Sequence, residues 1–183
     1  INTILETAAL DSGSVAIDKG EIDVARILAD ALQRAEIAAK AAEVRVENKG
    51  AAAGVNGWGD EERVGQAVDH LLRTAIKASP KGAAIFVRAA AGANGWVEVA
   101  VRDKGAGLTQ EAIVQALNAF GEVNRGLDRS FAGAGVGLAI AKTFVEMQGG
   151  RFDIKSRLGE GTIVCISLPP PQSAAKPAAQ QLR

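Results

Sequence analysis

Two glycine-rich stretches, DKGAG at residues 103–107 and GAGVGL at residues 133–138, hold the pattern that decides the fold. In both, glycines alternate with other residues, so the backbone can adopt positive φ and approach a ligand with no Cβ atom in the way. Apolar spacing after the second stretch predicts a helix over residues 138–147. A glycine loop that leads into a helix N-terminus offers backbone N–H donors to phosphate oxygens. Together the two stretches predict a nucleotide site.

Each stretch also has a simpler interpretation, as a turn after a strand or as a flexible loop before a helix. Two familiar phosphate-binding motifs are excluded. A P-loop needs Lys and then Ser or Thr directly after its last glycine, whereas Lys142 and Thr143 lie one turn inside the predicted helix. A dinucleotide-binding loop follows a buried strand, but residues 124–130 are mostly polar. Neither motif fits this chain.

The order of the motifs is more specific than any one of them. A helix ending near Lys77 is followed by the first glycine stretch, a segment with Phe120, the second glycine stretch and the turn GEGT at residues 159–162. This order resembles the N, G1, F, G2 and G3 boxes of the ATP-binding domain of bacterial histidine kinases, within the GHKL ATPase superfamily. The resemblance covers roughly residues 60–168.

The resemblance implies an α/β sandwich of the Bergerat type, with a mixed, mostly antiparallel sheet, helices packed on one face and a mobile ATP lid. Hydrophobic periodicity supports this layout, because helical and strand patterns both occur between the boxes. The sequence predicts helices over residues 23–42, 60–79 and 109–119, strands over residues 43–48, 84–90, 96–101, 151–156 and 162–168, and a loop over residues 51–59.

His70, Thr74 and Lys77 lie along one stripe of the helix predicted over residues 60–79, beside its apolar face. The resemblance implies catalytic roles for all three, with Lys77 reaching the terminal phosphates. At residue 74 the family carries an Asn that orients Mg²⁺. A Thr hydroxyl is a shorter and poorer neutral ligand, so Thr74 is a weak metal candidate unless it acts through a metal-bound water. Efficient catalysis is therefore expected to be lost. The simpler interpretation of His70 is a packed or solvated side chain.

The resemblance also assigns ATP or ADP to the glycine stretches. The Asp103 carboxylate would accept a hydrogen bond from the exocyclic amine of adenine and so reject guanine. Phe120 would anchor a lid over residues 121–132 and Arg129 would contact a phosphate, unless they are an ordinary core aromatic and a solvated arginine. Ala134 stands where a hydroxyl is usual in the family. The expected nucleotide-binding residues are Asp103, Gly105, Gly107, Phe120, Arg129, Gly133, Gly135, Gly137 and Leu138.

Composition excludes several classes of protein. The 183 residues are 48% hydrophobic, enough for one core. The 21 basic residues balance 21 acidic ones, so net charge does not indicate nucleic acid as a partner. Cys165 is the single cysteine and is predicted to be a small core residue. With one cysteine, no disulfide can form within the chain, which fits the reducing environment of the cytoplasm. No apolar run approaches the ~20 residues of a membrane span, though the parent protein could still be membrane-associated.

The chain is expected to be a fragment, because it opens in the middle of a pattern without an initiator Met. Residues 1–13 resemble the end of a dimerisation and phosphoacceptor helix, residues 14–168 the ATP-binding domain, and residues 169–183 a disordered tail. The implied function is that of a sensor histidine kinase in two-component signalling, which passes phosphate to a His outside this chain. The implied partners are a response regulator or partner kinase, its own phosphoacceptor domain and a second copy of the parent.

Two alternatives stay open. Thr74 favours an impaired member resembling pseudokinases such as the cell-cycle regulator DivL, or a scaffold that binds a response regulator or partner kinase without using ATP. The intact glycine stretches count against a complete loss of nucleotide binding. A gyrase-like or mismatch-repair ATPase would carry a Glu in place of His70 to activate water, so hydrolysis is disfavoured.

Overall fold

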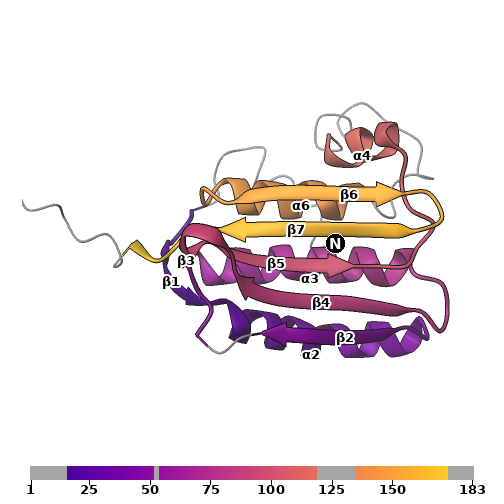
Figure 1. The fold of residues 1–183 in the computed structure, drawn as a ribbon, viewed down its shortest axis with the longest axis horizontal. Coiled ribbons are helices and arrows are strands. Elements are labelled where there is room, and N and C mark those ends of the chain that lie inside the picture. The colour runs from indigo at the N-terminus through magenta and orange to yellow at the C-terminus, as the bar shows by residue number, and fades with distance from the viewer. Residues whose placement is uncertain (1–15, 52–53, 119–134, 173–183) are drawn as a thin grey trace, which may run out of the picture.

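A computed structural model describes residues 16–51, 54–118 and 135–172. A five-stranded sheet in the order β2-β4-β5-β7-β6 carries helices α2, α3 and α6 on one face (Figure 1). Among the strands that the structure describes, β2 and β4 are the one pair that runs in parallel. The elements are β1 (Gly20–Asp23), α2 (Val24–Ala41), β2 (Arg45–Ala51), β3 (Asn56–Gly59), α3 (Glu61–Ala78), β4 (Ala84–Ala91), η1 (Ala93–Gly95), β5 (Val97–Arg102), α4 (Gln110–Leu117), α6 (Gly135–Glu146), β6 (Arg151–Arg157) and β7 (Gly161–Leu168).

This architecture confirms the predicted α/β sandwich with a mixed, mostly antiparallel sheet and helices on one face. Three helices begin where a side-chain oxygen caps the first turn: Asp23 accepts from Arg26 N, Asp60 from Arg63 N, and Thr109 from Ala112 N. Each such cap satisfies an N–H group that has no partner inside its own helix, a contribution of about 1 kcal/mol. In the part of the chain that the structure describes, no helix is long and apolar enough to cross a membrane.

The core lies between the sheet and the helices. Alternate residues of the central strands point inward, where they meet the apolar stripes of α2, α3 and α6. Burial of each large apolar side chain contributes about 1.5 to 3 kcal/mol, so this layer supplies most of the favourable free energy of folding. Its largest side chains with less than 2% exposure include Leu28, Leu71, Leu72, Ile85, Ile140, Phe144, Ile166 and Leu168.

The loop predicted over residues 51–59 is wrong. β2 extends to Ala51, and β3 (Asn56–Gly59) pairs antiparallel with β1 (Gly20–Asp23), a strand that the sequence patterns missed. Glycines conceal the alternation of β3, because they have no side chain to show which face is buried. A Cβ atom on Gly59 would lie 2.5 Å from Oε1 of Gln148, so a larger residue there would displace the Gln148 side chain.

The prediction that Cys165 is a core residue is also wrong. Cys165 is half-buried and alternates along β7 with the buried Val164 and Ile166, so it lies on the face of the sheet opposite the helices. An apolar run with small residues does not reveal which of its two faces is covered. Burial raises the pKa of the Cys165 thiol, and the nearby Asp153 and Glu98 carboxylates act in the same direction.

A buried polar junction joins the start of the described chain to the helical layer. The Asp18 N–H donates to Oδ2 of Asp60 at 2.9 Å, and the Asp60 N–H donates to Oε1 of Gln148. Gln148 is 2% exposed and donates through Nε2 to the Phe144 carbonyl. Because each buried polar group has a partner, the junction fixes the segment before β1 against α3 and α6.

Candidate functional site

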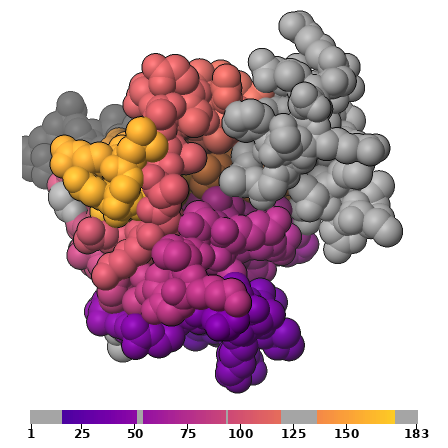
Figure 2. All heavy atoms as spheres, turned by 90° about the vertical axis from the view of Figure 1, so that its right-hand side faces the viewer, coloured from indigo at the N-terminus to yellow at the C-terminus, as the bar shows by residue number. Residues whose placement is uncertain are grey.

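The G1 segment, the G3 turn and the last turn of α3 lie at one end of the described structure, where β5 and α3 finish and the β6–β7 hairpin turns (Figure 1). Figure 2 looks onto this end. Atoms of the segment that follows β5 lie between those of the hairpin and those of α3, and α4 lies at the top of this view. Strand ends and a helix end therefore surround the same region.

Asp103 is the first residue after β5 and is 6% exposed. Its Oδ1 accepts hydrogen bonds from Gly105 N at 2.8 Å and from Thr162 N at 3.2 Å. Within the described ranges, Oδ2 accepts none. Burial raises the pKa of the Asp103 carboxyl, and the two backbone hydrogen bonds oppose that shift. A buried carboxylate with one oxygen unused is suited to a ligand that donates a hydrogen bond.

The G1 glycines lie against the protein's own backbone. A Cβ atom on Gly105 would come 2.5 Å from the carbonyl O of Ala78, at the end of α3. Gly107 has a φ of +73°, and a Cβ atom there would collide with the Arg157 carbonyl. Both glycines are thus required by packing whether or not a ligand binds. Their contact with nucleotide stays a prediction.

The G3 turn packs into the G1 segment from the other side. Gly159 N donates to the Ala106 carbonyl at 2.7 Å, and Gly161, with a φ of +93°, lies where a Cβ atom would collide with the Asp103 carbonyl. Gly161 therefore does more than form the hairpin turn, which is the role predicted for it. The two loops interlock, and their contact holds Asp103 in place.

Residues of the N and G2 boxes meet where α3 packs on α6. His70 is 5% exposed, and Thr74 donates through Oγ1 to the His70 carbonyl at 2.8 Å. A Cβ atom on Gly137 would lie 3.0 Å from Thr74 Oγ1 and 3.6 Å from His70 Nδ1. The absence of a side chain at residue 137 therefore lets the backbone of α6 lie close to Thr74 and His70. Two sets of residues far apart in the sequence are brought together here.

α6 begins at Gly135, three residues earlier than predicted, so Gly135 and Gly137 belong to its first turn and not to a loop before it. Helix geometry is compatible with glycine wherever packing on α3 compensates for its low helix propensity. The side chain of Leu138 is 2% exposed and belongs to the core. Contact between Leu138 and a nucleotide would therefore involve its backbone.

The remaining predicted residues differ in what the structure says of them. Lys77 is exposed in the last turn of α3, on the helix that carries Thr74. Phe120, Arg129, Gly133 and the predicted lid lie outside the described residues. No group of three His, Cys, Asp or Glu side chains within the described ranges could hold a metal ion. For Mg²⁺, the described residues offer the neutral Thr74 hydroxyl, whose proton is already donated to the His70 carbonyl.

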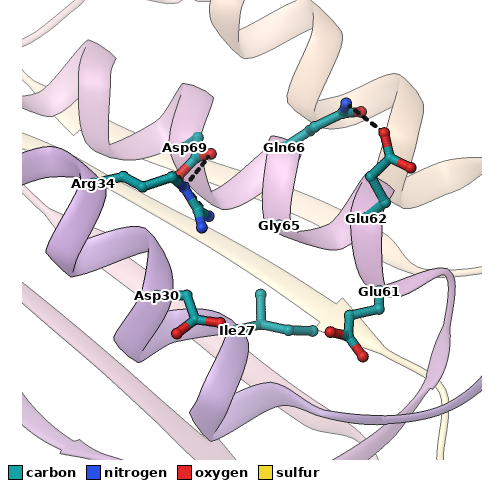
Figure 3. A pocket seen from close by; sticks show the side chains of 8 residues that line it. All are labelled: Ile27, Asp30, Arg34, Glu61, Glu62, Gly65, Gln66 and Asp69. Atoms are coloured by element: carbon teal, nitrogen blue, oxygen red, sulfur yellow. Dashed lines mark hydrogen bonds and ion pairs between the residues drawn. The ribbon is translucent and has the colours of Figure 1, made fainter.

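A groove of about 450 Å³ opens between α2 and α3 (Figure 3), and Thr74 is not among the residues that line it. Carboxylates dominate its lining, and Arg34 pairs with Asp69 across it at 3.1 Å. Acidic groups repel phosphate, so the groove does not suit a nucleotide. It is lined by Ile27, Asp30, Arg34, Glu61, Glu62, Gly65, Gln66 and Asp69.

The sequence patterns missed Ser156 as a residue of this site. Its Oγ accepts a hydrogen bond from Leu108 N at 2.8 Å and contacts Thr162 Oγ1 at 2.8 Å. Its place on the inward face of a predicted strand, just before the G3 turn, was the one available signal. Strand periodicity gives the face of a side chain, but not the loop that it bonds.

Residues 59–172 match the family described as histidine kinase-, DNA gyrase B-, and HSP90-like ATPase. The chain belongs to this family. It is 27% identical over 180 residues to the histidine protein kinase DivJ of Caulobacter vibrioides, covering 97% of this chain and 30% of DivJ. It is 28% identical over 170 residues to the sensor-like histidine kinase SenX3 of Mycolicibacterium smegmatis, covering 92% of this chain and 44% of SenX3.

The fold of this ATPase domain is similar to that of full-length ShkA in complex with AMPPNP, with a TM-score of 0.75 and 22% identity over 92% of this chain and 34% of ShkA. The chain spans less than half the length of DivJ and SenX3. The predicted family, the ATP-binding catalytic domain of histidine kinases, is thereby confirmed.

Proposed function

We propose that this ATPase domain binds adenine nucleotide through Asp103 and serves as the ATP-binding domain of a sensor histidine kinase. The observation that carries the proposal is the buried Asp103 carboxylate, held through Oδ1 by two backbone N–H groups while Oδ2 stays available. An acceptor fixed in this way recognises a donor such as the exocyclic amine of adenine. A purine with a carbonyl at that position would leave the carboxylate unpaired.

The phosphates lie between α3 and the start of α6. Gly135 and Gly137 in the first turn of α6 have N–H groups at the positive end of a helix dipole, which favours an anion. Lys77 adds a positive charge from the last turn of α3. Gly137 brings this first turn close to Thr74, the residue expected beside the metal.

In the parent protein, an imidazole nitrogen of a His outside this chain attacks the γ-phosphorus of ATP, and the bond to the leaving oxygen of ADP breaks. Catalysis of phosphoryl transfer depends on positioning and on stabilising charge. The partners are a response regulator, the parent's own phosphoacceptor domain and a second copy of the parent, in the cytoplasm.

Thr74 makes this copy slow at phosphoryl transfer, as in a pseudokinase. Its hydroxyl proton is donated to the His70 carbonyl, which leaves one small neutral oxygen where the family's Asn presents an amide oxygen. Mg²⁺, when bound, neutralises charge that develops on the phosphates, so a loosely held ion lowers turnover more than it lowers affinity. The second candidate function, a scaffold that does not use ATP, is favoured by this same substitution.

Calorimetry with ADP tests the binding proposal. We expect Asp103→Asn to weaken ADP binding by about 10- to 100-fold, because a hydrogen bond to a charged group contributes about 1.5 to 3 kcal/mol. The matched control is Asp30→Asn, which removes an exposed carboxylate from the groove between α2 and α3. Equal affinity in the wild type and in Asp103→Asn would refute the assignment, and no binding by either would favour the scaffold.

Transfer of labelled γ-phosphate in the full-length parent tests the role of Thr74. We expect Thr74→Asn to raise both Mg²⁺-dependent ATP affinity and phosphorylation of the acceptor His, compared side by side with the wild type. Robust transfer by the wild type, unchanged by the substitution, would show that Thr74 is an adequate ligand. No gain in either measurement would place the defect elsewhere, with Ala134 the next residue to test.

A further inference from the structure

Ser156, on the inner face of β6, contacts three polar groups with one hydroxyl. Its Oγ lies 2.8 Å from the backbone N of Leu108, 3.0 Å from the carbonyl O of Gly161 and 2.8 Å from Oγ1 of Thr162. These partners belong to the segment after G1 and to the start of β7. One side chain thus fastens together the two segments that flank Asp103.

The three contacts fix the direction of each hydrogen bond. The Leu108 N–H can only donate and the Gly161 carbonyl can only accept, whereas a hydroxyl can do either. Two oxygens 3.0 Å apart with no proton between them repel each other. Ser156 therefore donates its single proton to Gly161 and accepts from Leu108 N and from the Thr162 hydroxyl. The Thr162 proton is thereby directed at Ser156.

Thr162 lies directly across from Asp103. The Asp103 N–H donates to the Thr162 carbonyl at 2.9 Å, and the Thr162 N–H donates to Asp103 Oδ1 at 3.2 Å. Both residues are buried, with exposures of 8% for Thr162 and 6% for Asp103. Because the Thr162 proton is committed to Ser156, Oγ1 of Thr162 presents lone pairs only. Two acceptors, the Asp103 carboxylate and this hydroxyl oxygen, thus belong to directly neighbouring residues.

We propose that Ser156 is a positioning residue for base selection, which acts by holding Thr162 as an obligate hydrogen-bond acceptor beside Asp103. The inference rests on the proposed binding of nucleotide at Asp103. An amine at C6 of a purine has two N–H donors and suits neighbouring groups that only accept. A carbonyl at C6, as in guanine or hypoxanthine, faces acceptors and gains no hydrogen bond. Without Ser156, the Thr162 hydroxyl is free to rotate and donate to that carbonyl.

The test compares ADP with inosine diphosphate, which has a carbonyl at C6 in place of the amine. Calorimetry gives the ratio of their affinities in the wild type, in Ser156→Ala and in Ser156→Thr. We expect the wild type to prefer ADP, Ser156→Ala to lower the ratio about tenfold, and Ser156→Thr, which keeps a hydroxyl, to restore it. A purely structural role for Ser156 would weaken both nucleotides equally and leave the ratio unchanged, and that result would overturn the inference.

Two further variants keep the test decisive. Thr162→Val removes the acceptor and leaves Ser156 in place, so the ratio of ADP affinity to inosine diphosphate affinity should fall in this variant too. This ratio can be measured even if Ser156→Ala does not fold. An unchanged ratio in Thr162→Val overturns the inference. Ser167 lies on β7 with Thr162 but on the opposite face of that strand. Ser167→Ala should therefore leave the ratio of the two affinities as it is in the wild type. Failure of the wild type to bind either nucleotide would reject the proposed function itself, whereas binding without a change of ratio rejects only the role of Ser156.

Discussion

The two ends of the candidate site are built in different ways. At the end proposed to hold the adenine base, called the base end, backbone packs on backbone. Gly107 lies against Arg157 and Gly161 lies against Asp103, with no room for a Cβ atom. At the end proposed to hold the phosphates, called the phosphate end, Gly137 of α6 faces the side chains of His70 and Thr74 on α3. Similar glycine patterns therefore meet two different requirements. One keeps two backbone segments in contact, and the other lets α6 lie close to polar side chains of α3.

The largest expected effect tests the base end. Gly107→Ala should destabilise the domain by about 3 kcal/mol or more, because the new Cβ atom collides with the Arg157 carbonyl and the residue is held at a φ of +73°. Gly159→Ala is the matched control, since Gly159 has a φ of +79° but nothing within 4 Å of its Cβ position. It should cost only about 1 to 2 kcal/mol. Urea unfolding measures both, and equal losses would contradict the packing explanation.

The next effect concerns Asp103 and the stability of the nucleotide-free domain. Because the folded pKa of Asp103 is raised, its contribution to stability is complete below its ordinary pKa of 3.8 and is lost as pH rises through the folded value. Asp103→Asn removes this titration while keeping an oxygen for Gly105 N and Thr162 N. We expect the variant to melt above the wild type at neutral pH, with a difference that narrows towards acid pH. A difference that is constant with pH would show that burial does not penalise the Asp103 charge.

A smaller effect tests the phosphate end. Gly137→Ala should cost about 1 kcal/mol, because its Cβ atom would lie 3.0 Å from Thr74 Oγ1 and one of the two must shift. In a Thr74→Ala background the clash is absent and alanine is the better helix former, so Gly137→Ala should then stabilise. A double-mutant cycle by urea unfolding gives the coupling, expected in the range of about 0.5 to 3 kcal/mol. The same cost in both backgrounds would mean that the two residues do not meet.

The smallest effect lies outside both ends. Arg34→Ala should change stability by less than about 1 kcal/mol, because the Arg34–Asp69 pair is largely exposed and water screens it. ADP affinity should not change, since the groove between α2 and α3 is separate from the candidate site. A loss of ADP binding in calorimetry would show that this groove communicates with Asp103.

Sequence patterns predicted the strands of the main sheet and the three main helices, because hydrophobic periodicity is a local signal. The glycine stretch beside Asp103 was predicted from the order of the boxes along the chain. They missed β1 and β3, since paired short strands with glycines show no alternation. They also missed Ser156, because its partners Leu108 and Gly161 reach it only through the folding of the hairpin. Periodicity identifies the buried face of an element, but not the group that a side chain on it will meet.

The interlocked loops at the base end bear on how members of this family diverge. Gly105, Gly107 and Gly161 are held by contacts inside the protein, so a lineage that stopped using nucleotide would still be selected to keep them in order to fold. The groups released from selection would be those without such contacts, above all the second carboxylate oxygen of Asp103, since an Asn would still accept from Gly105 N and Thr162 N. In comparisons among descendants, intact G1 and G3 glycines therefore record a preserved fold, and drift at position 103 records the loss of an ancestral ligand.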